Sequence, residues 1–268
     1  MNTPIALTIA GSDPSGGAGV AADLKTFSAL GVYGAAVITA LTAQNTKGVF
    51  GIHDVPADFV AAQLNALFTD LDPNAVKIGM LANAATIDAV AAAVDRYQPP
   101  NVVLDPVMIA ASGDRLLRAD AIDALRNELM PRALLITPNL PEAAALLDAD
   151  IASDEAAMRT QAERLLAAGA KAVLMKGGHG TGPESADLLV EHTGVTRFAA
   201  ARLATRNTHG TGCTLSSAIA AGLARGLALR AAVREAKAYV TAAIASSDQL
   251  SVGRGRGPLH HFHAWWPT

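Results

Sequence analysis

Hydrophobic and polar residues along this chain form two kinds of segment that alternate with each other. Short, mostly apolar runs bounded by polar, Gly or Pro positions indicate β-strands, and longer Ala-rich segments with apolar residues at helical spacing indicate α-helices. The predicted strands are Ile5–Ala10, Ala35–Ala40, Ala75–Gly79, Val102–Asp105, Leu134–Thr137, Ala172–Lys176, Asp187–Glu191 and Arg197–Ala200. The predicted helices are Ala21–Leu30, Ala57–Phe68, Ala84–Tyr97, Ala119–Leu129, Glu142–Leu147, Glu155–Ala168, Thr211–Arg225 and Arg230–Ser247.

Hydrophobic residues in these strands are continuous rather than at every second position, which is typical of strands buried on both faces. Their alternation with helices predicts an α/β fold, with a central, mostly parallel sheet flanked by helices on both faces. The last two strands are joined through His192-Thr193-Gly194, which predicts a hairpin added to that sheet. Because no repeat or low-complexity linker interrupts the pattern, and residues 253–258 are interpreted as a turn, we expect a single domain over residues 1–268.

Composition narrows the class of protein. The chain has 268 residues, of which 51% are hydrophobic, enough for a sizeable core in one unit. A net charge of −3 gives no electrostatic footprint for nucleic acid. The apolar run at residues 4–10 is too short to span a membrane, and no later run reaches that length without interruption. A single cysteine fits a reducing compartment, so we expect a soluble, cytoplasmic protein.

Ligands of open parallel sheets gather at the carboxyl ends of the strands. The glycine-rich turn at residues 11–19 follows the first strand, but its spacing is not that of a dinucleotide-binding site. It offers Asp13 and Asp23 as polar candidates, with helix capping as the alternative for Asp13. Gln44 carries a donor and an acceptor that match an aminopyrimidine edge, or it is an ordinary loop residue. Met80 could wall an apolar pocket or belong to the core.

Charged residues follow the next three strands. Asp105 and Glu142 could hold a hydrated Mg²⁺, which takes one or two carboxylates besides phosphate oxygens. Glu142 could equally cap the first turn of its helix. Lys176 stands where it could reach a phosphate as a point charge, although a lysine that ends a strand is often only solvated.

The segment Asn207-Thr208-His209-Gly210-Thr211-Gly212-Cys213-Thr214-Leu215 turns from a loop into a long apolar helix. Gly210 and Gly212 would let an anion approach the unpaired N–H groups of a helix start, unless they form only a small-residue cap. Cys213 is either a small buried hydrophobe or a working thiol whose pKa the helix N-terminus lowers. Metal ligands, a cation and an anion hole are what phosphoryl transfer requires. The P-loop and protein-kinase motifs are absent from the sequence, which excludes those two classes.

These positions lie within motifs that cover essentially the whole chain. The motifs are Ala10–Gly19, Leu41–Thr46, Lys77–Leu81, Asp105–Met108, Thr137–Glu142, Lys176–His179, Asn207–Thr214 and Gly257–Trp266. In this order they resemble the ribokinase superfamily and, within it, the hydroxymethylpyrimidine/phosphomethylpyrimidine kinases of thiamine biosynthesis. The resemblance implies a ribokinase-like fold and ATP-dependent phosphorylation of 4-amino-5-hydroxymethyl-2-methylpyrimidine to its monophosphate and then to the diphosphate. It also implies Mg²⁺ as cofactor and a homodimer.

The resemblance further assigns roles to residues. Gln44 would bind the aminopyrimidine, with Gly11, Asp23, Met80 and Val107 around the ring. Asp105 and Glu142 would serve Mg²⁺. The residues expected to bind ATP are Asn139, Lys176, Thr208, Gly210, Thr211 and Gly212, and those expected to act in catalysis are Cys213, Gly210, Gly212 and Lys176.

Two positions depart from relatives. Cys213 stands where ribokinase-like sugar kinases and many pyridoxal kinases have an aspartate base, so the thiol is either a general base or a positioning residue. Ala111 stands where many relatives have lysine, in a segment expected to form a flap over the pyrimidine. We expect a weaker grip on the monophosphate, which would affect the second phosphorylation more than the first.

Two other functions compete with the pyrimidine kinase. Pyridoxine also presents a hydroxymethyl group on a nitrogen heterocycle, so pyridoxal kinase activity is the alternative within the superfamily, and Cys213 argues against it. A ligand-binding regulator that has lost catalysis would have lost parts of the site. The chain instead retains Asp105, Glu142 and Lys176 as well as both glycines of the helix start.

Overall fold

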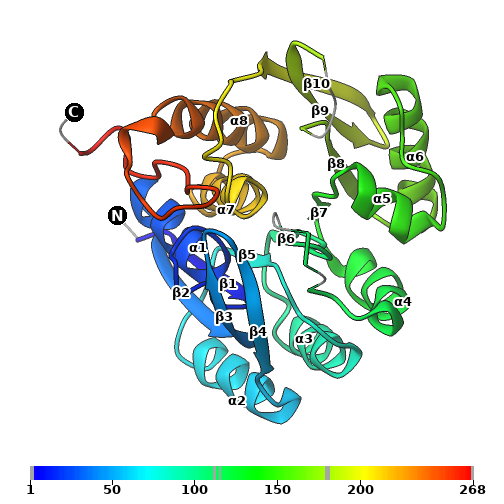
Figure 1. The fold of residues 1–268 in the computed structure, drawn as a ribbon. Helices are drawn as coiled ribbons and strands as arrows, with labels where there is room; N and C mark the ends of the chain where they lie inside the picture. Colours follow the sequence, from blue (N-terminus) through cyan, green and yellow to red (C-terminus); the bar gives the residue numbers. More distant parts are fainter. Residues whose placement is uncertain (1–2, 111–112, 115, 179–181, 267–268) are drawn as a thin grey trace.

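An eight-stranded sheet forms the centre of the computed structural model, which describes residues 3–110, 113–114, 116–178 and 182–266. The strand order is β10-β9-β8-β7-β6-β5-β1-β2 (Figure 1). Strands β8 to β2 of this order pair in parallel, and β9 and β10 continue the sheet as an antiparallel hairpin. The strands are β1 (Ile5–Ala10), β2 (Tyr33–Ile38), β5 (Ala75–Ile78), β6 (Val102–Leu104), β7 (Leu135–Ile136), β8 (Ala172–Lys176), β9 (Glu184–Glu191) and β10 (Gly194–Ala201).

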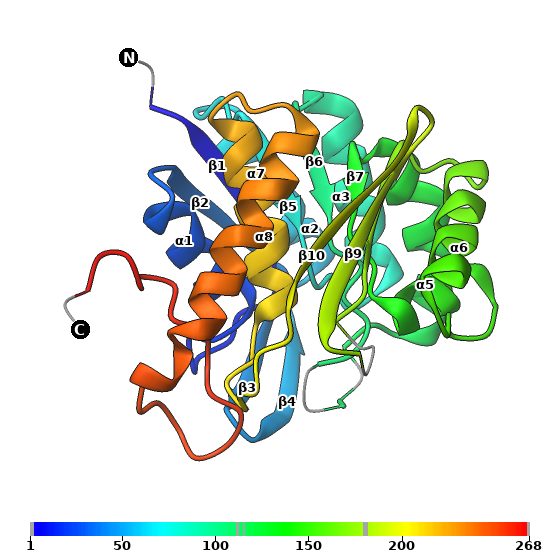
Figure 2. The ribbon, with the colours of Figure 1, turned by 90° about the horizontal axis from the view of Figure 1, so that it is seen from above.

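Helices cover both faces of this sheet (Figures 1 and 2). The main helices are α1 (Gly19–Ala29), α2 (Ala57–Phe68), α3 (Ala84–Tyr97), α5 (Leu140–Leu147), α6 (Glu155–Ala167), α7 (Thr211–Ala224) and α8 (Leu229–Ala245). Successive side chains of each strand enter opposite cores. Leu7 and Ile9 pack with the side of the sheet that carries α2, α3, α5 and α6, whereas Ala6 packs with the side of α1, α7 and α8. The predicted α/β class, with a mostly parallel sheet covered on both faces, is confirmed.

One pair of strands was not predicted. β3 (Ala40–Asn45) and β4 (Gly48–Asp54) form a separate two-stranded antiparallel sheet. Buried and exposed positions alternate at the start of β3, and no residue of β4 is buried, so both strands lack the continuous apolar run of a strand buried on two faces. Gln44, expected in a loop after β2, therefore lies on a strand of this hairpin.

The predicted helix over residues 119–129 is irregular. It consists of a 3₁₀ turn (Ala119–Ala121), a single α turn, α4 (Ile122–Ala124), and a π turn (Leu125–Leu129), followed by a 3₁₀ turn (Met130–Arg132) that contains Pro131. The proline cannot donate a backbone hydrogen bond, which ends the regular helix. Within the described residues, no helix has the length and apolar composition needed to cross a membrane.

Candidate active site

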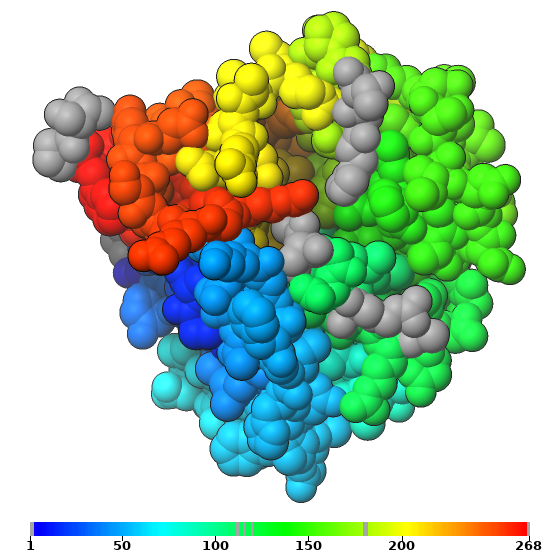
Figure 3. All heavy atoms as spheres, viewed as in Figure 1, coloured from blue at the N-terminus to red at the C-terminus, as the bar shows by residue number. Residues whose placement is uncertain are grey.

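The carboxyl ends of β1, β5, β6, β7 and β8 open into one cavity of about 630 Å³. The space-filling view shows a hollow between the loop before α7, the hairpin β9–β10 and the orange-red C-terminal segment (Figure 3). All but one of the residues expected in the site line this cavity. These are Gly11, Gln44, Met80, Asp105, Val107, Asn139, Glu142, Lys176, Thr208, Gly210, Thr211, Gly212 and Cys213.

The start of α7 supplies donors to this cavity. Gly210 precedes the helix with φ +81°, and a Cβ there would lie 1.8 Å from the carbonyl oxygen of Gly17, so no other residue fits without displacing the backbone. Among the described residues, the backbone N–H groups of Gly212 and Cys213 have no hydrogen-bond acceptor. A helix start with free N–H groups attracts an anion.

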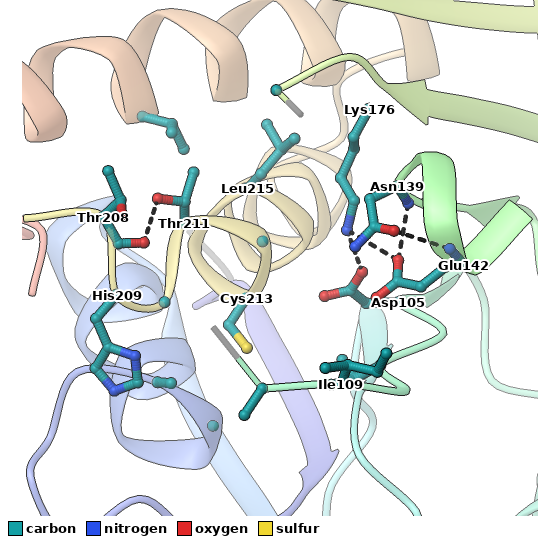
Figure 4. Close-up of a pocket in the computed structure, with 18 of the residues that line it drawn as sticks. Asp105, Ile109, Asn139, Glu142, Lys176, Thr208, His209, Thr211, Cys213 and Leu215 are labelled. Atoms are coloured by element: carbon teal, nitrogen blue, oxygen red, sulfur yellow. Dashed lines mark hydrogen bonds and ion pairs between the residues drawn. The ribbon is translucent and has the colours of Figure 1, made fainter. Parts of the chain in front are cut away.

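A lysine and two carboxylates converge beside Gly212 (Figure 4). Lys176 ends β8, and its Nζ lies 2.8 Å from Asp105 Oδ1 and 3.6 Å from Glu142 Oε2. Asn139 and Glu142 form a capping box at the start of α5, in which Asn139 N donates to Glu142 Oε2 and Glu142 N donates to Asn139 Oδ1. Glu142 therefore caps the helix, as one alternative expected, and it also lines the cavity, while its role as a Mg²⁺ ligand stays a prediction.

The two carboxylates share one ammonium unequally. Burial raises the pKa of Asp105, but the charges of Lys176 and Lys77 outweigh it and hold that pKa below its usual range. Burial raises the pKa of Glu142 to about 7, because the more distant Lys176 only partly offsets it. Lys176 is itself held protonated, since Asp105 and Glu142 overcome the lowering of its pKa by burial.

This donor set fits a hydrated Mg²⁺. Asp105 Oδ2 accepts only a 3.3 Å hydrogen bond from Ser216, and within the described part of the chain Glu142 Oε1 accepts none. Two carboxylates with oxygens to spare, next to a place for phosphate, are the ligands that Mg²⁺ prefers. Described His, Cys, Asp and Glu side chains form no group of three that would enclose a metal without substrate oxygens.

Asp23 is the exception among the expected site residues, because it does not line the cavity. Its carboxylate is fully buried in an ion pair with Lys77, 2.8 Å from Lys77 Nζ. Thr8 and Ser217 also donate to it, each at 2.6 Å. A contact between Asp23 and the pyrimidine stays a prediction, and what the structure shows is the counterion of Lys77.

Lys77, which sequence reasoning did not single out, lies in the wall of the cavity. The period of two along β5 directs Val76 and Ile78 to one core and Lys77 to the opposite face, where Asp23 of α1 meets it. Burial lowers the pKa of Lys77, but the charge of Asp23 outweighs this effect. The Lys77 ammonium is therefore held charged. Two buried Asp–Lys pairs therefore flank the start of α7. Consecutive residues of that helix donate a hydrogen bond to each pair, Ser216 to Asp105 and Ser217 to Asp23.

The single cysteine lines the cavity (Figure 4), and the charges of Lys77, Asp23 and Asp105 act on its thiol. Its environment contradicts the lowered pKa expected from its position at a helix start. Burial raises the pKa of the Cys213 thiol to about 11, and the charge of Lys77 offsets this only in part. Near neutral pH the resting side chain is therefore the thiol rather than the thiolate.

A second buried link holds the loop before α7 in place. His209 Nε2 lies 2.7 Å from Asp13 Oδ2, and Asp13 also accepts hydrogen bonds from the backbone N–H groups of Ser15 and Ala18. Although burial raises the pKa of Asp13, the bonds from His209 and Ser15 lower it below its usual range. Asp13 is therefore a link between the glycine-rich turn after β1 and the helix start that carries the anion hole.

Comparison with known proteins identifies the family. A family model described as phosphomethylpyrimidine kinase matches residues 13–260. The chain belongs to the phosphomethylpyrimidine kinase family. The hydroxymethylpyrimidine/phosphomethylpyrimidine kinase of Rhizobium meliloti is 59% identical over 264 residues, which cover 98% of this chain and 99% of that protein. The thiamine biosynthesis bifunctional protein ThiED of Geobacter sulfurreducens is 52% identical over 258 residues, which are 96% of this chain and 52% of that protein.

A solved structure confirms the ribokinase-like fold. The ADP complex of Bacillus subtilis pyridoxal kinase superimposes with a TM-score of 0.91 at 35% identity, covering 98% of this chain and 99% of that one. Membership of the phosphomethylpyrimidine kinase family thus agrees with what the ordered motifs predicted.

Sequence reasoning missed further polar residues of this family member's cavity. Asp187 of β9 and Lys237 of α8 form an ion pair with 2.7 Å between Oδ2 and Nζ, and Asp187 Oδ1 accepts from Gly177 N at 3.0 Å. Lys77 could have been found, because a lysine between Val76 and Ile78 in an apolar strand needs a buried partner. Lys237 gives no such signal, because one lysine in an amphipathic helix is ordinarily solvated. Ala111 lies outside the described residues.

Proposed function

We propose that this protein transfers the γ-phosphoryl group of ATP to the hydroxymethyl group of 4-amino-5-hydroxymethyl-2-methylpyrimidine, and then phosphorylates the monophosphate to the diphosphate in thiamine biosynthesis. One observation carries the proposal. In a member of the phosphomethylpyrimidine kinase family, a single cavity contains Gln44, the free N–H groups at the start of α7 and the Lys176 cluster. The ADP complex of the similar pyridoxal kinase supports ATP as the donor.

Charge stabilisation is the main contribution of the chain to this reaction. The transferred phosphoryl group carries its negative charge on oxygens that preorganised donors can bind. We assign this role to the N–H groups of Gly212 and Cys213 and to the protonated Lys176. Asn139, Thr208 and Thr211 also line the cavity and would hold the other phosphates.

Asp105 and Glu142 would hold Mg²⁺ in this proposal. When bound, the ion supplies Lewis-acid stabilisation to the phosphate oxygens. The ion pair between Lys176 and Asp105 keeps that carboxylate ionised and oriented for such a role.

Gln44, with Gly11, Met80 and Val107, would bind the acceptor ring. Met80 packs directly against Gly11, where a Cβ would come within 2.9 Å of the methionine sulfur, so both residues would form one side of the ring site. Gln44 Oε1 lies 3.1 Å from Thr42 Oγ1, which fixes the amide on the hairpin.

For Cys213 we propose the positioning role. A loose transition state demands little deprotonation of the attacking hydroxyl, and a thiol with a pKa of about 11 is protonated when the acceptor binds. The thiol would hold the hydroxymethyl oxygen in line, and catalysis would come from alignment and electrostatics.

Pyridoxal kinase activity is the second candidate, favoured by the structural similarity to the Bacillus subtilis enzyme. A hydroxymethyl group on a nitrogen heterocycle would meet the same anion hole. Parallel assays with pyridoxine and the pyrimidine decide between them, and we expect the higher kcat/KM with the pyrimidine.

We also propose that residues 1–268 act as one domain in a cytoplasmic homodimer. One sheet supplies strand ends to the whole cavity, which supports the single domain. The use of ATP and a free thiol in the site support a reducing, cytoplasmic compartment. Exposed apolar side chains on the hairpin β3–β4, Leu41, Phe50 and Ile52, support self-association.

The decisive experiment is incubation with ATP, Mg²⁺ and the hydroxymethylpyrimidine, followed by mass detection of the mono- and diphosphate. We expect both products, and neither after chelation of Mg²⁺ with EDTA. Absence of the monophosphate in the complete reaction would contradict the proposed function. A Lys176→Met variant serves as the inactive control, with an expected loss of kcat of about 10²-fold or more.

A further inference from the structure

The strand that carries Gln44 is attached to the loop after β1 through one residue, Ser12. Ser12 N donates to the carbonyl oxygen of Ala40, the first residue of β3, at 2.8 Å. Thr42 N donates to Ser12 Oγ at 3.1 Å, and Thr42 Oγ1 donates to the Ser12 carbonyl oxygen at 2.9 Å. Because Gly11, next to Ser12, lines the cavity, these bonds hold β3 in a fixed position relative to the expected ring site.

The Gln44 amide is in turn held by Thr42. Residues two positions apart in a strand lie on the same side, and Gln44 Oε1 lies 3.1 Å from Thr42 Oγ1. The register of β3 against β4 shifts between Ala43 and Gln44, which marks a β-bulge. Bulges change the direction of side chains and are over-represented next to active sites. Among the described residues, Thr42 is the hydrogen-bond partner of the Gln44 side chain, and Gln44 lines the cavity.

The Thr42 hydroxyl group has a single proton for two neighbouring oxygens. A threonine hydroxyl donates one hydrogen bond and accepts two, whereas a carbonyl oxygen only accepts. Thr42 Oγ1 lies 2.9 Å from the Ser12 carbonyl oxygen and 3.1 Å from Gln44 Oε1. The proton belongs to the shorter bond, because the Ser12 carbonyl has no other donor within the described part of the chain. The Thr42 hydroxyl is then left to accept a hydrogen bond from Gln44.

The orientation of the Gln44 amide decides whether this network is complete. A turn of 180° about its last bond exchanges Oε1 and Nε2 with no change of shape. With Nε2 beside Thr42 Oγ1, Gln44 donates to Thr42 and Thr42 donates to Ser12, so every group is paired. With Oε1 in that place, two acceptors compete for one proton, and the acceptor left without a donor costs free energy. The network therefore favours one orientation of the amide over the other.

That orientation matters for the ring that the amide binds. A 4-aminopyrimidine presents a donor, its exocyclic amine, beside an acceptor, the adjacent ring nitrogen. The 4-oxo analogue, in which a carbonyl oxygen replaces the amine, presents the reverse order, an acceptor beside a ring N–H. One orientation of a glutamine amide complements the first pattern, and the turned amide complements the second. An amide held in one orientation therefore distinguishes the two rings, whereas an amide that turns freely does not.

We propose that Thr42 is a positioning residue that sets the specificity of the ring site, by holding the Gln44 amide in the orientation that accepts a 4-aminopyrimidine and rejects the 4-oxo analogue. The inference rests on the proposed function, which identifies the amino pattern as the preferred one. Thr42 acts through Gln44 rather than on the ring. A 4-oxo ring binds only if the amide turns, which leaves an acceptor of the Thr42 network without a proton.

The test measures binding of the hydroxymethylpyrimidine and of its 4-oxo analogue by calorimetric titration of nucleotide-free protein. Wild type should bind the amino compound about tenfold or more tightly than the analogue. Thr42→Val removes the hydroxyl at nearly the same shape, so the amide is free to turn. We expect the ratio of the two affinities to fall about tenfold, and the 4-oxo analogue to bind Thr42→Val more tightly than wild type. A variant that folds poorly does not gain affinity.

Two further variants separate the hydroxyl from the anchoring of the hairpin. Thr42→Ser keeps the hydroxyl and should keep the affinity ratio within about twofold of wild type. Ser12→Ala removes the Oγ that accepts from Thr42 N but leaves the carbonyl oxygen that accepts from Thr42 Oγ1. It should also keep the ratio, because anchoring of the hairpin affects both rings alike.

Equal changes of both affinities in Thr42→Val would make Thr42 only a brace of the hairpin and would overturn the inference. An unchanged ratio in Thr42→Val, or a Thr42→Ser variant that behaves like the valine, would overturn it as well. So would a wild type that binds both rings equally tightly. The phosphorylation assay keeps the proposed function apart from this result. A wild type with the expected binding preference but no phosphorylated product would contradict the kinase activity and still support the role of Thr42.

Discussion

Cys213 shows at the scale of one residue how burial can outweigh a helix start. The N-terminus of α7 favours a thiolate, and Lys77 adds a positive charge, yet burial and the charges of Asp23 and Asp105 raise the thiol pKa to about 11. Sequence reasoning places the cysteine at the helix start but cannot weigh burial, because burial is set by residues from β1, β5 and β6. The direction of the pKa shift is therefore information that only the fold supplies.

Alkylation of this thiol tests that direction. Cys213 is the only cysteine, so the rate of reaction with iodoacetamide reports on it alone. A raised pKa leaves little thiolate at pH 7, and the rate should still be rising with pH well above 9, where a free cysteine with a pKa of about 8.5 has nearly reached its plateau. A plateau at or below pH 8 would show that the helix start dominates.

The role of the Cys213 thiol is tested by kinetics of Cys213 variants with two acceptors, the hydroxymethylpyrimidine and its monophosphate. A general base contributes about 10²–10⁴-fold, but only when the acceptor is the alcohol, because the phosphate acceptor is already ionised. For a positioning residue we expect Cys213→Ala to lower kcat by about tenfold or less with both acceptors, and Cys213→Asp to give no gain over alanine. A large loss of kcat confined to the alcohol acceptor would instead show that Cys213 acts as the general base.

At the scale of elements, the loop before α7 depends on one glycine. Gly210 combines φ +81° with a clash of 1.8 Å between a Cβ and the Gly17 carbonyl oxygen. Gly226, after the end of the same helix, has φ +87° but nothing within 4 Å of a Cβ. Substituting each glycine in turn therefore separates the effect of backbone strain, present at both positions, from that of the close approach of two loops, present only at Gly210.

We expect Gly210→Ala to lower kcat by about 10²–10³-fold, because a displaced loop removes the donors for the transferred phosphoryl group. Gly226→Ala should cost only about 1–2 kcal/mol of stability, from the left-handed backbone, with kcat unchanged. Urea unfolding and steady-state kinetics on both variants give the comparison. Equal kcat in the two variants would mean that the start of α7 does not hold the phosphoryl group.

The elements themselves were predicted to different extents for physical reasons. β1 and β8 agree with the predicted bounds to the residue, because burial on both faces gives them nearly continuous hydrophobic residues. The hairpin β3–β4 was missed because it is largely exposed and pairs only with itself. Gln44 was nevertheless singled out, since its motif identifies it whichever secondary structure carries it.

For the whole molecule, the cluster at the strand ends could be predicted, but the buried ion pairs between the layers could not. Asp105, Glu142 and Lys176 were predicted together, because consecutive strand ends of a parallel sheet meet at one edge. The pair of Lys77 with Asp23 was not, because it joins a strand to a helix 54 positions apart on the face of the sheet covered by α1. Such pairs depend on how the layers stack.

The hairpin that sequence patterns missed is also where we expect two copies of the chain to meet. Leu41, Phe50 and Ile52 are 48%, 70% and 41% exposed there, and large exposed apolar side chains are common at protein–protein interfaces. We expect Phe50→Asp to convert a dimer into a monomer, because a carboxylate buried at an interface loses its hydration. Phe59→Asp is the matched control, since Phe59 is 61% exposed on α2 and outside the hairpin. Light scattering coupled to size exclusion at several protein concentrations gives the mass of each. A dimeric Phe50→Asp variant would move the interface away from the hairpin, and a monomeric wild type would contradict the homodimer itself.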